Sequence, residues 1–197
     1  MTFTNEVPPT FFLQLDLDWL DHQIEHVRAM IRQVKLQGQE STEQSSESWH
    51  DNYNFEESQR QLKMLMNHLG GLSKARERAI VVEPLELPTV VDVGTTVTFV
   101  DVQSGSSDTF SIGSYMVSDD LRDLDFISYE TPVAEVLRGL AVGDSRVGKV
   151  GGHDREFRVT AIYSATPSLE IAREARKLSE LDNVAMDGSV NGGNGEG

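Results

Sequence analysis

The sequence predicts an α+β protein: an N-terminal antiparallel helical hairpin, a coiled coil, followed by a small antiparallel sheet domain with one short helix. Three observations lead to this prediction. Apolar residues recur at helical spacing over residues 1–84. Residues 89–163 instead alternate with a period of two between Gly- and Asp-containing turns. Between them, Pro84 and Pro88 favour an extended linker, because proline and the residue before it disfavour helix.

The hairpin prediction depends on two apolar seams. The first steps by four and three residues along Leu13, Leu17, Leu20, Ile24, Val27, Ile31 and Val34. The second follows sevens, threes and fours along Phe55, Leu62, Leu65, Leu69, Leu72 and Ala79. Two seams separated by a polar stretch fold back most simply as an antiparallel pair. Arms of about 30 residues would each reach about 45 Å.

The stretch between the seams is strongly acidic. Residues 40–57 contain six carboxylates and no lysine or arginine. Like charges within a helical turn repel by a few tenths of a kcal/mol. One interpretation is a solvated loop. The other is a tip that is delivered to a cation.

The second region reads as a curled sheet packed against a helix. The segments "GTTVTFVDV" and "DTFSIGSYMV" predict paired strands joined through "QSGSSD". In "ETPVAEVLRGL", Thr131 can cap a helix and Pro132 suits its first position. The side chains expected to face the sheet from this helix are Val133, Val136, Leu137 and Leu140. The strand "REFRVTAIY" predicts an inward row of Phe157, Val159, Ala161 and Tyr163.

The chain therefore divides into four predicted parts: a hairpin over 1–84 with its acidic tip near 40–57, a sheet domain over 85–163, an extra helix over 164–181 and a disordered tail over 182–197. The extra helix begins at Thr166 and Pro167. Its apolar side is Leu169, Ala172, Ala175 or Arg176, and Leu178 or Leu181. The tail is rich in Gly and Asn, which favours disorder.

Composition excludes several classes of protein. The formal net charge is −15, which argues against non-specific binding of duplex DNA through a basic surface. Without cysteine, neither disulfides nor Cys-based zinc sites can form. We expect no signal peptide and no membrane span, and hence a cytoplasmic protein. Asp18, His22 and His26 have a zinc-compatible helical spacing, but the polar faces of coiled coils often carry such residues.

The segment "ISYETPVAEVLRGLAVGD" resembles the C-terminal domain of the GreA/GreB family of bacterial transcription elongation factors. The matching positions are Ile127, Ser128, Pro132, Ala134, Leu137, Gly139, Gly143 and Asp144, with Thr131 where the family has serine. The resemblance implies that the sheet domain has the fold of FK506-binding prolyl isomerases (FKBP-like).

The resemblance also implies a function. Family members insert their coiled coil into the secondary channel of RNA polymerase and stimulate cleavage of backtracked RNA, without being enzymes themselves. Their tip carboxylates help to hold a Mg²⁺ ion jointly with the polymerase, and oxygen ligands suit that ion. In this sequence the tip residues assigned to cleavage are Asp51, Glu47 and Asn52, with Asp51 and Glu47 as the metal ligands. Ser48 and Asn54 stand where the family has carboxylates.

The sheet domain is the expected polymerase anchor, through Thr131, Pro132 and Val133. The expected partners are RNA polymerase and, indirectly, the 3′ end of nascent RNA. We expect a monomer in the bacterial cytoplasm, associated with the nucleoid through polymerase. Basic residues of the second arm either form a solvated face or meet polymerase or RNA: Arg60, Lys63, Lys74, Arg76 and Arg78.

Two other functions stay open. The degenerate tip is compatible with a secondary-channel binder that inhibits or regulates polymerase without stimulating cleavage. The FKBP-like fold is compatible with a prolyl isomerase or chaperone. That chemistry needs an aromatic-lined pocket, and few aromatic residues of this domain can be spared from a core.

Overall fold

The computed structural model describes the backbone of residues 8–44 and 51–188, and the side chains of 8–37 and 56–179. The chain forms two compact units. The first comprises Met1–Thr10 and Asp16–Val81, and the second comprises Phe11–Leu15 and Val82–Gly197. The second unit is therefore built from two separate stretches of the sequence.

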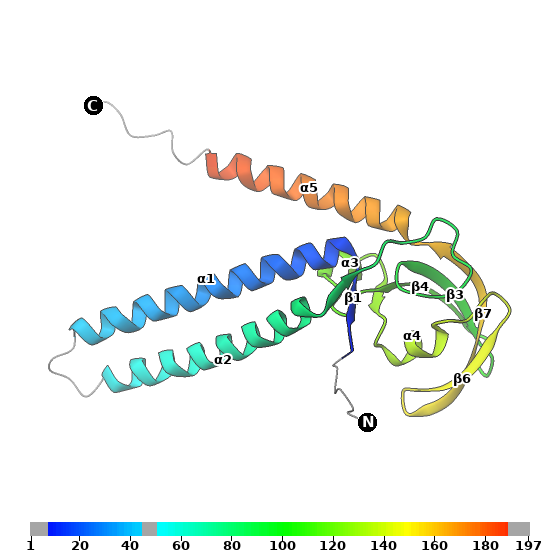
Figure 1. Cartoon of the computed structure of the whole chain (residues 1–197), viewed down its shortest axis with the longest axis horizontal. Coiled ribbons are helices and arrows are strands. Elements are labelled where there is room, and N and C mark those ends of the chain that lie inside the picture. Colours follow the sequence, from blue (N-terminus) through cyan, green and yellow to red (C-terminus); the bar gives the residue numbers. More distant parts are fainter. Residues whose placement is uncertain (1–7, 45–50, 189–197) are drawn as a thin grey trace, which may run out of the picture. The chain divides into compact units, whose positions relative to one another are not determined.

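In the first unit, two long helices run side by side in opposite directions (Figure 1). They are α1, Gln14–Gln44, and α2, Asp51–Glu77. With 31 residues, α1 is about 46 Å long. The seam residues buried on α1 are Leu17, Leu20, Ile24, Val27 and Ile31, whereas α2 buries Leu72 and Ala75. The predicted hairpin is confirmed.

The ends of the predicted seams are wrong. Leu13 precedes α1 and belongs to the core of the second unit, where its backbone N–H donates to Ser114 Oγ at 2.8 Å. Ala79 lies beyond α2 in the short strand β2, Ala79–Val81. Heptad spacing continued across both helix ends by coincidence, so it did not mark where the helices stop.

The second unit contains a five-stranded sheet with the order β5-β4-β3-β7-β6. Its strands are β3 Thr95–Asp101, β4 Ser107–Gly113, β5 Phe126–Ser128, β6 Ser145–Val150 and β7 His153–Ser164. The strand β1, Thr10–Phe12, lies outside this sheet. The prediction of an antiparallel sheet is wrong at one edge, because β4 and β5 pair in parallel. Between them, the crossover through helix α3, Asp119–Arg122, returns the chain in the same direction.

A β-bulge in β7 corrects the predicted inward row. Thr98 pairs with Ala161, but the next residue, Phe99, pairs with Val159, so Thr160 is the extra residue. Because side chains alternate with a period of two, one inserted residue exchanges the two faces beyond it. Phe157 and Val159 are buried as predicted. Beyond the bulge Ile162 packs on the core instead, and Tyr163 is exposed.

Helix α4, Pro132–Leu137, packs closely on β6. Gly148 of β6 makes this possible, because a Cβ atom at this position would lie 2.1 Å from Cγ2 of Val136. The predicted core face of this segment is confirmed, since Val136, Leu137 and Leu140 are buried and Val133 is partly buried against the core.

The C-terminal helix α5, Thr166–Gly188, begins where predicted and continues past the predicted end at 181. It packs on the second unit through Leu169 and Ala172, which are buried. Arg176 fixes it further, because its guanidinium pairs with Asp120 at 2.7 Å and donates to the backbone oxygen of Leu15. Leu178, predicted on the apolar side, is 64% exposed. No described helix is long and apolar enough to cross a membrane.

Candidate functional site

The acidic tip joins the two helices of the hairpin. Asp51 and Asn52 are the first residues of α2, so Asp51 stands at the helix N-terminus, where the helix dipole favours a negative charge. Their side chains lie outside the described part of the chain, and Glu47 lies outside the described residues altogether. The ligand geometry predicted for Asp51 and Glu47 therefore stays a prediction.

One carboxylate near the tip is described in full. Glu57 accepts from Arg60 Nη1 at 3.2 Å and from Gln61 Nε2 at 3.4 Å, and both partners are on its own helix. Its charge is thus partly neutralised within α2. Glu57 is for this reason a poor candidate for an external cation, and it provides an internal control.

The predicted anchor loop is ordered by Ser128. The Ser128 carbonyl accepts from the N–H of Thr131 at 3.0 Å and from its Oγ1 at 2.9 Å. Thr131 is the N-cap of α4 as predicted, but its hydroxyl donates backwards to this turn rather than capping the helix. Pro132 takes the first turn of α4 and is exposed, whereas Val133 is partly buried. Of these three consecutive residues, Pro132 is therefore the most exposed.

Tyr129, which the sequence analysis did not identify as a site residue, connects this loop to Phe11 and Arg138. Its hydroxyl accepts from the N–H of Phe11 at 3.3 Å, and its ring meets that of Phe11 edge-on at 5.8 Å. The guanidinium of Arg138 lies 4.9 Å from the ring centroid, within cation–π range. Arg138 also pairs with Asp92 at 3.0 Å. Burial raises the pKa of the Tyr129 phenol, so the ring stays neutral.

A second ordered turn joins β3 to β4 and is built by Asp101. Its Oδ1 accepts from the backbone N–H groups of Gln103 and Ser104 at 3.0 and 3.3 Å, and Oδ2 lies 3.3 Å from Arg155 Nη1. Burial raises the pKa of Asp101, but these hydrogen bonds and the Arg155 charge outweigh it and leave the pKa below its usual value. This carboxylate is structural.

Other candidate chemistry is not supported. Among the described residues, no group of three or more His, Cys, Asp or Glu side chains could hold a metal ion, so Asp18, His22 and His26 form no such site. The aromatic rings of the sheet domain mostly pack on one another. Phe99 meets Phe110 at 5.1 Å and Phe157 at 5.4 Å, within the core rather than lining a pocket.

The hairpin and the curled mixed sheet with its short helix define an α+β protein of two units, with an acidic turn on one and an ordered loop on the other. Residues 86–164 match the sequence model of the C-terminal domain of the GreA/GreB transcription elongation factors. The chain thus contains a region similar to the C-terminal domain of that family. The match ends at the last residue of β7, so α5 lies outside it.

Two curated proteins are similar over longer stretches. Transcription elongation factor GreA of Aliarcobacter butzleri is 25% identical over 120 residues, which are 60% of this chain and 73% of that protein. Transcription elongation factor GreA of Geobacillus kaustophilus is 30% identical over 87 residues, 44% of this chain and 54% of that protein. The chain thus spans only about half the length of the second relative.

Solved structures of similar proteins superpose weakly. GreA factor homolog 1 (Gfh1) of Thermus thermophilus has 23% identity and a TM-score of 0.37, covering 79% of this chain and 99% of the other. The GreA/GreB factor of Nitrosomonas europaea has 21% identity and a TM-score of 0.31, covering 80% of this chain and 99% of the other.

Proposed function

We propose that this protein is a transcription elongation factor that inserts its hairpin into the secondary channel of RNA polymerase and stimulates cleavage of backtracked RNA. The observation that carries the proposal is the family match over residues 86–164, directly after a helical hairpin whose turn carries six carboxylates within residues 40–57. It would act on the polymerase and not as an enzyme itself. The two GreA proteins similar to this chain are named transcription elongation factors.

The hairpin suits the delivery of charge into a narrow space. The 27 residues of α2 span about 40 Å, so a side chain at the turn reaches far from β2. At that turn Asp51 and Glu47 would supply carboxylate oxygens, and Asn52 would supply an amide oxygen, to a Mg²⁺ held jointly with the polymerase. The ion, when bound, would supply water activation and charge stabilisation for phosphodiester cleavage.

The sheet domain would anchor the factor. Thr131, Pro132 and Val133 form a short surface. The ring of Pro132 is exposed, and the residues on either side of it are each held by contacts within the sheet domain. Thr131 is tied to Ser128, and Val133 is seated against the core. A rigid loop loses little conformational entropy on binding, which favours its use as a contact.

The decisive experiment adds the protein to a stalled, backtracked polymerase with Mg²⁺ and measures shortening of the RNA. We expect shortening by the native protein and its loss in Asp51→Asn, with Glu47→Gln reduced about ten- to a hundredfold, since a contact to a charged oxygen contributes about 1.5–3 kcal/mol. Glu57→Gln is the matched control, because Arg60 and Gln61 already engage that carboxylate. Polymerase binding, measured separately, should survive in all three variants. Full activity of Asp51→Asn would remove the proposed role of that residue.

A second candidate function is occupation of the channel without cleavage. The sequence favours it at two positions, because Ser48 and Asn54 are uncharged where the family has carboxylates. The same assay separates the two functions. Slower elongation with no shortening of the RNA would establish the inhibitor and reject the cleavage factor.

A further inference from the structure

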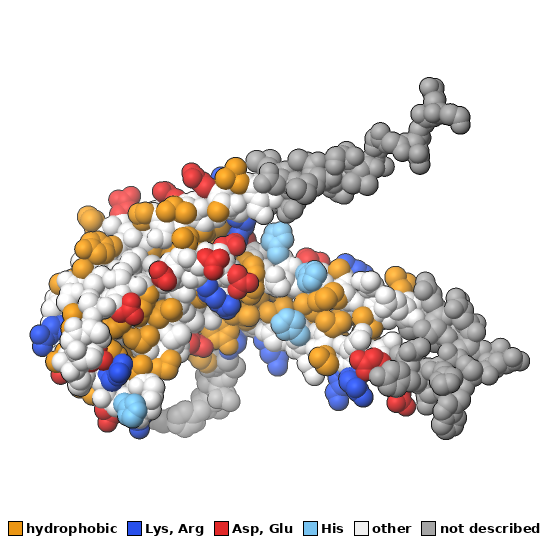
Figure 2. Space-filling view, turned by 180° about the vertical axis from the view of Figure 1, so that it is seen from behind, with side chains coloured by type: hydrophobic (Ala, Val, Ile, Leu, Met, Phe, Trp, Pro, Cys, Tyr) orange, Lys and Arg blue, Asp and Glu red, His pale blue; other side chains and the backbone are white. Residues whose placement is uncertain are grey.

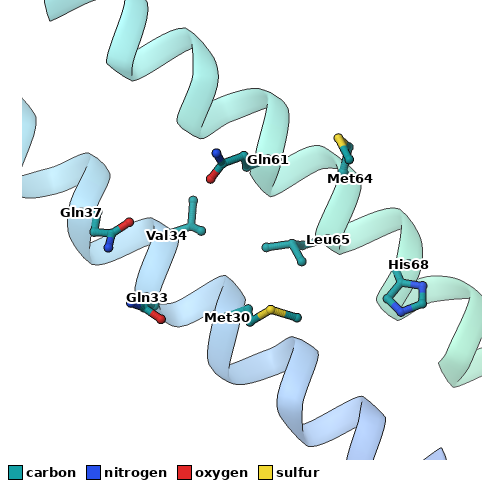
Figure 3. A pocket seen from close by; sticks show the side chains of 8 residues that line it. All are labelled: Met30, Gln33, Val34, Gln37, Gln61, Met64, Leu65 and His68. Carbon is teal, nitrogen blue, oxygen red and sulfur yellow. The ribbon is translucent and has the colours of Figure 1, made fainter. Parts of the chain in front are cut away.

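A groove of about 540 Å³ runs along the hairpin between α1 and α2 (Figure 3). Each helix lines it with residues at positions i, i+3, i+4 and i+7, which is one continuous helical face. The lining residues are Met30, Gln33, Val34 and Gln37 of α1, and Gln61, Met64, Leu65 and His68 of α2. Seven positions correspond to about 10 Å along each helix. In Figure 3 Val34 and Leu65 point toward each other across the groove, and Gln37 and Gln61 lie at the same end of it.

The groove contains an exposed apolar side chain, Met64. Among the described residues of the two helices, the large hydrophobic side chains that are exposed are Leu36, Met64 and Met66, at 60%, 65% and 56%. Of these, Met64 lines the groove, whereas Leu36 and Met66 do not. Figure 2 shows apolar side chains along the shaft of the hairpin. Methionine adapts to irregular apolar partners and is frequent at surfaces that bind helices. An uncovered apolar surface of this kind marks an interaction site.

Basic residues predominate along the helix stretches that form the groove, although Glu57 accepts from the lining residue Gln61. No carboxylate occurs between Glu25 and Glu40, or between Glu57 and Glu77. These two stretches hold seven of the 17 lysines and arginines of a chain whose net charge is −15: Arg28, Arg32, Lys35, Arg60, Lys63, Lys74 and Arg76. We call this set the basic belt.

The belt is neutralised only at its ends. Arg28 pairs with Glu25 and Arg60 with Glu57, each three positions away, and Arg76 pairs with Asp21. Within the described side chains, Arg32, Lys35 and Lys63 meet no carboxylate. The groove therefore combines an uncharged, methionine-containing floor with basic edges.

We propose that this groove binds an acidic amphipathic α-helix of a partner protein. The periodic lining on both walls fits the apolar face of a third helix, which would complete a three-helix packing. The basic belt fits carboxylates on the flanks of such a helix. A second copy of this chain is disfavoured by its own net charge of −15. RNA is less favoured by the floor, which offers no Lys or Arg for phosphates and only the imidazole of His68 as a ring for base stacking.

The test uses the full chain and a labelled peptide of about 18 residues, long enough to form helix. Its leucines stand at every third and fourth position, with glutamate and alanine elsewhere. We expect saturable binding by fluorescence anisotropy. A peptide with lysine in place of every glutamate, and one with alanine in place of every leucine, should each bind at least about tenfold more weakly. Peptide binding is measured without polymerase, so its result does not depend on the outcome of the cleavage assay.

Two methionines of α2 give a matched pair of variants. Met64 lines the groove and Met66 does not, although both are more than half exposed, so neither substitution should disturb folding. Met64→Gln should weaken peptide binding about fivefold, the loss expected for one apolar contact. Met66→Gln should change it less than twofold. Lys63→Glu should weaken binding and reduce its dependence on salt.

Three results would overturn the proposal. The first is absence of binding by the native chain at about millimolar peptide. The second is equal weakening by Met64→Gln and Met66→Gln. The third is a single-stranded RNA that displaces the peptide and loses affinity in Met64→Gln, which would assign the groove to nucleic acid instead.

Discussion

The two units of this protein bury their apolar residues in different ways. The sheet domain surrounds a core on several sides, so that Ile112, Leu121 and Leu137 are fully buried. The hairpin has one seam, and its α2 side is only partly covered: Leu62, Leu65 and Leu69 keep intermediate exposure. A unit with one buried stripe leaves apolar and basic side chains available to partners. The comparison indicates that the sheet domain provides stability and the hairpin provides contact surface.

The largest expected effect comes from the same substitution made in each unit. Leu137→Ala should lower the free energy of unfolding of the sheet domain by about 2–5 kcal/mol, because a cavity remains in a closed core. Leu65→Ala should lower that of the hairpin by only about 1 kcal/mol, since its side chain is partly exposed in the folded state. Both tryptophans, Trp19 and Trp49, precede residue 82, so their fluorescence in urea follows the hairpin. Amide exchange in β3 and β7 follows the sheet domain. Equal losses would contradict the comparison.

Replacing glycine by alanine should have opposite effects on stability in the two units. Gly148→Ala should destabilise the sheet domain by about 1–3 kcal/mol, because its Cβ would lie 2.1 Å from Val136 Cγ2. Amide exchange of β6 measures this directly. The double variant Gly148→Ala with Val136→Ala removes the obstructing methyl groups and should recover part of the loss. No recovery would mean that the close approach of α4 is not the cause.

In the hairpin, by contrast, a glycine-to-alanine substitution should increase stability. Gly70 lies inside α2, and a Cβ atom at this position would have no neighbour within 4 Å beyond its own stretch of helix, so Gly70→Ala meets no obstacle. Alanine favours helix over glycine by roughly 1 kcal/mol, and the hairpin should gain about that amount. Tryptophan fluorescence in urea measures the midpoint. A lower midpoint would show that α2 needs flexibility at this position for its native packing.

The smallest expected effect concerns pH and the turn built by Asp101. Its pKa is lowered in the folded state, so its contribution is complete above the unfolded pKa of about 4 and is lost as the pH falls through the folded value. Stability of the sheet domain should therefore decline in this acidic range. Asp101→Asn should be less stable at neutral pH and should show a flatter decline. Parallel pH profiles for the two proteins would exclude Asp101 as the titrating group.

Periodicity predicted the hairpin because a two-helix seam repeats over many residues and averages out local exceptions. Alternation with a period of two likewise predicted β3 and β4. It failed where one residue decides the outcome. The bulge at Thr160 moves Tyr163 outward, and no pattern in "REFRVTAIY" distinguishes the inserted residue. The parallel pairing of β5 depends on a crossover of four helical residues, which is too short to give a periodic signal.

The candidate site was predictable in part. Thr131, Pro132 and Val133 could be identified by resemblance, but Tyr129 and Arg138 could not, because their roles arise from contacts with Phe11 and Asp92, far away in the sequence. The groove was missed because its lining continues the apolar seam. Sequence alone does not tell a covered seam position from an open one. The available signal was the absence of carboxylates between Glu25 and Glu40 and between Glu57 and Glu77.

Residues 11–15 have a practical consequence for anyone who cuts this chain in two. Tyr115 donates its N–H to the carbonyl of Phe11, Val82 donates to that of Phe12, and Ser114 accepts from Leu13. A fragment that starts at residue 82 contains the whole family match but lacks these three partners and two buried leucines. Such a fragment begins with exposed polar groups and an open flank. A soluble, self-sufficient C-terminal piece should instead carry residues 11–15 at its front, joined to residue 82 by a short flexible connector.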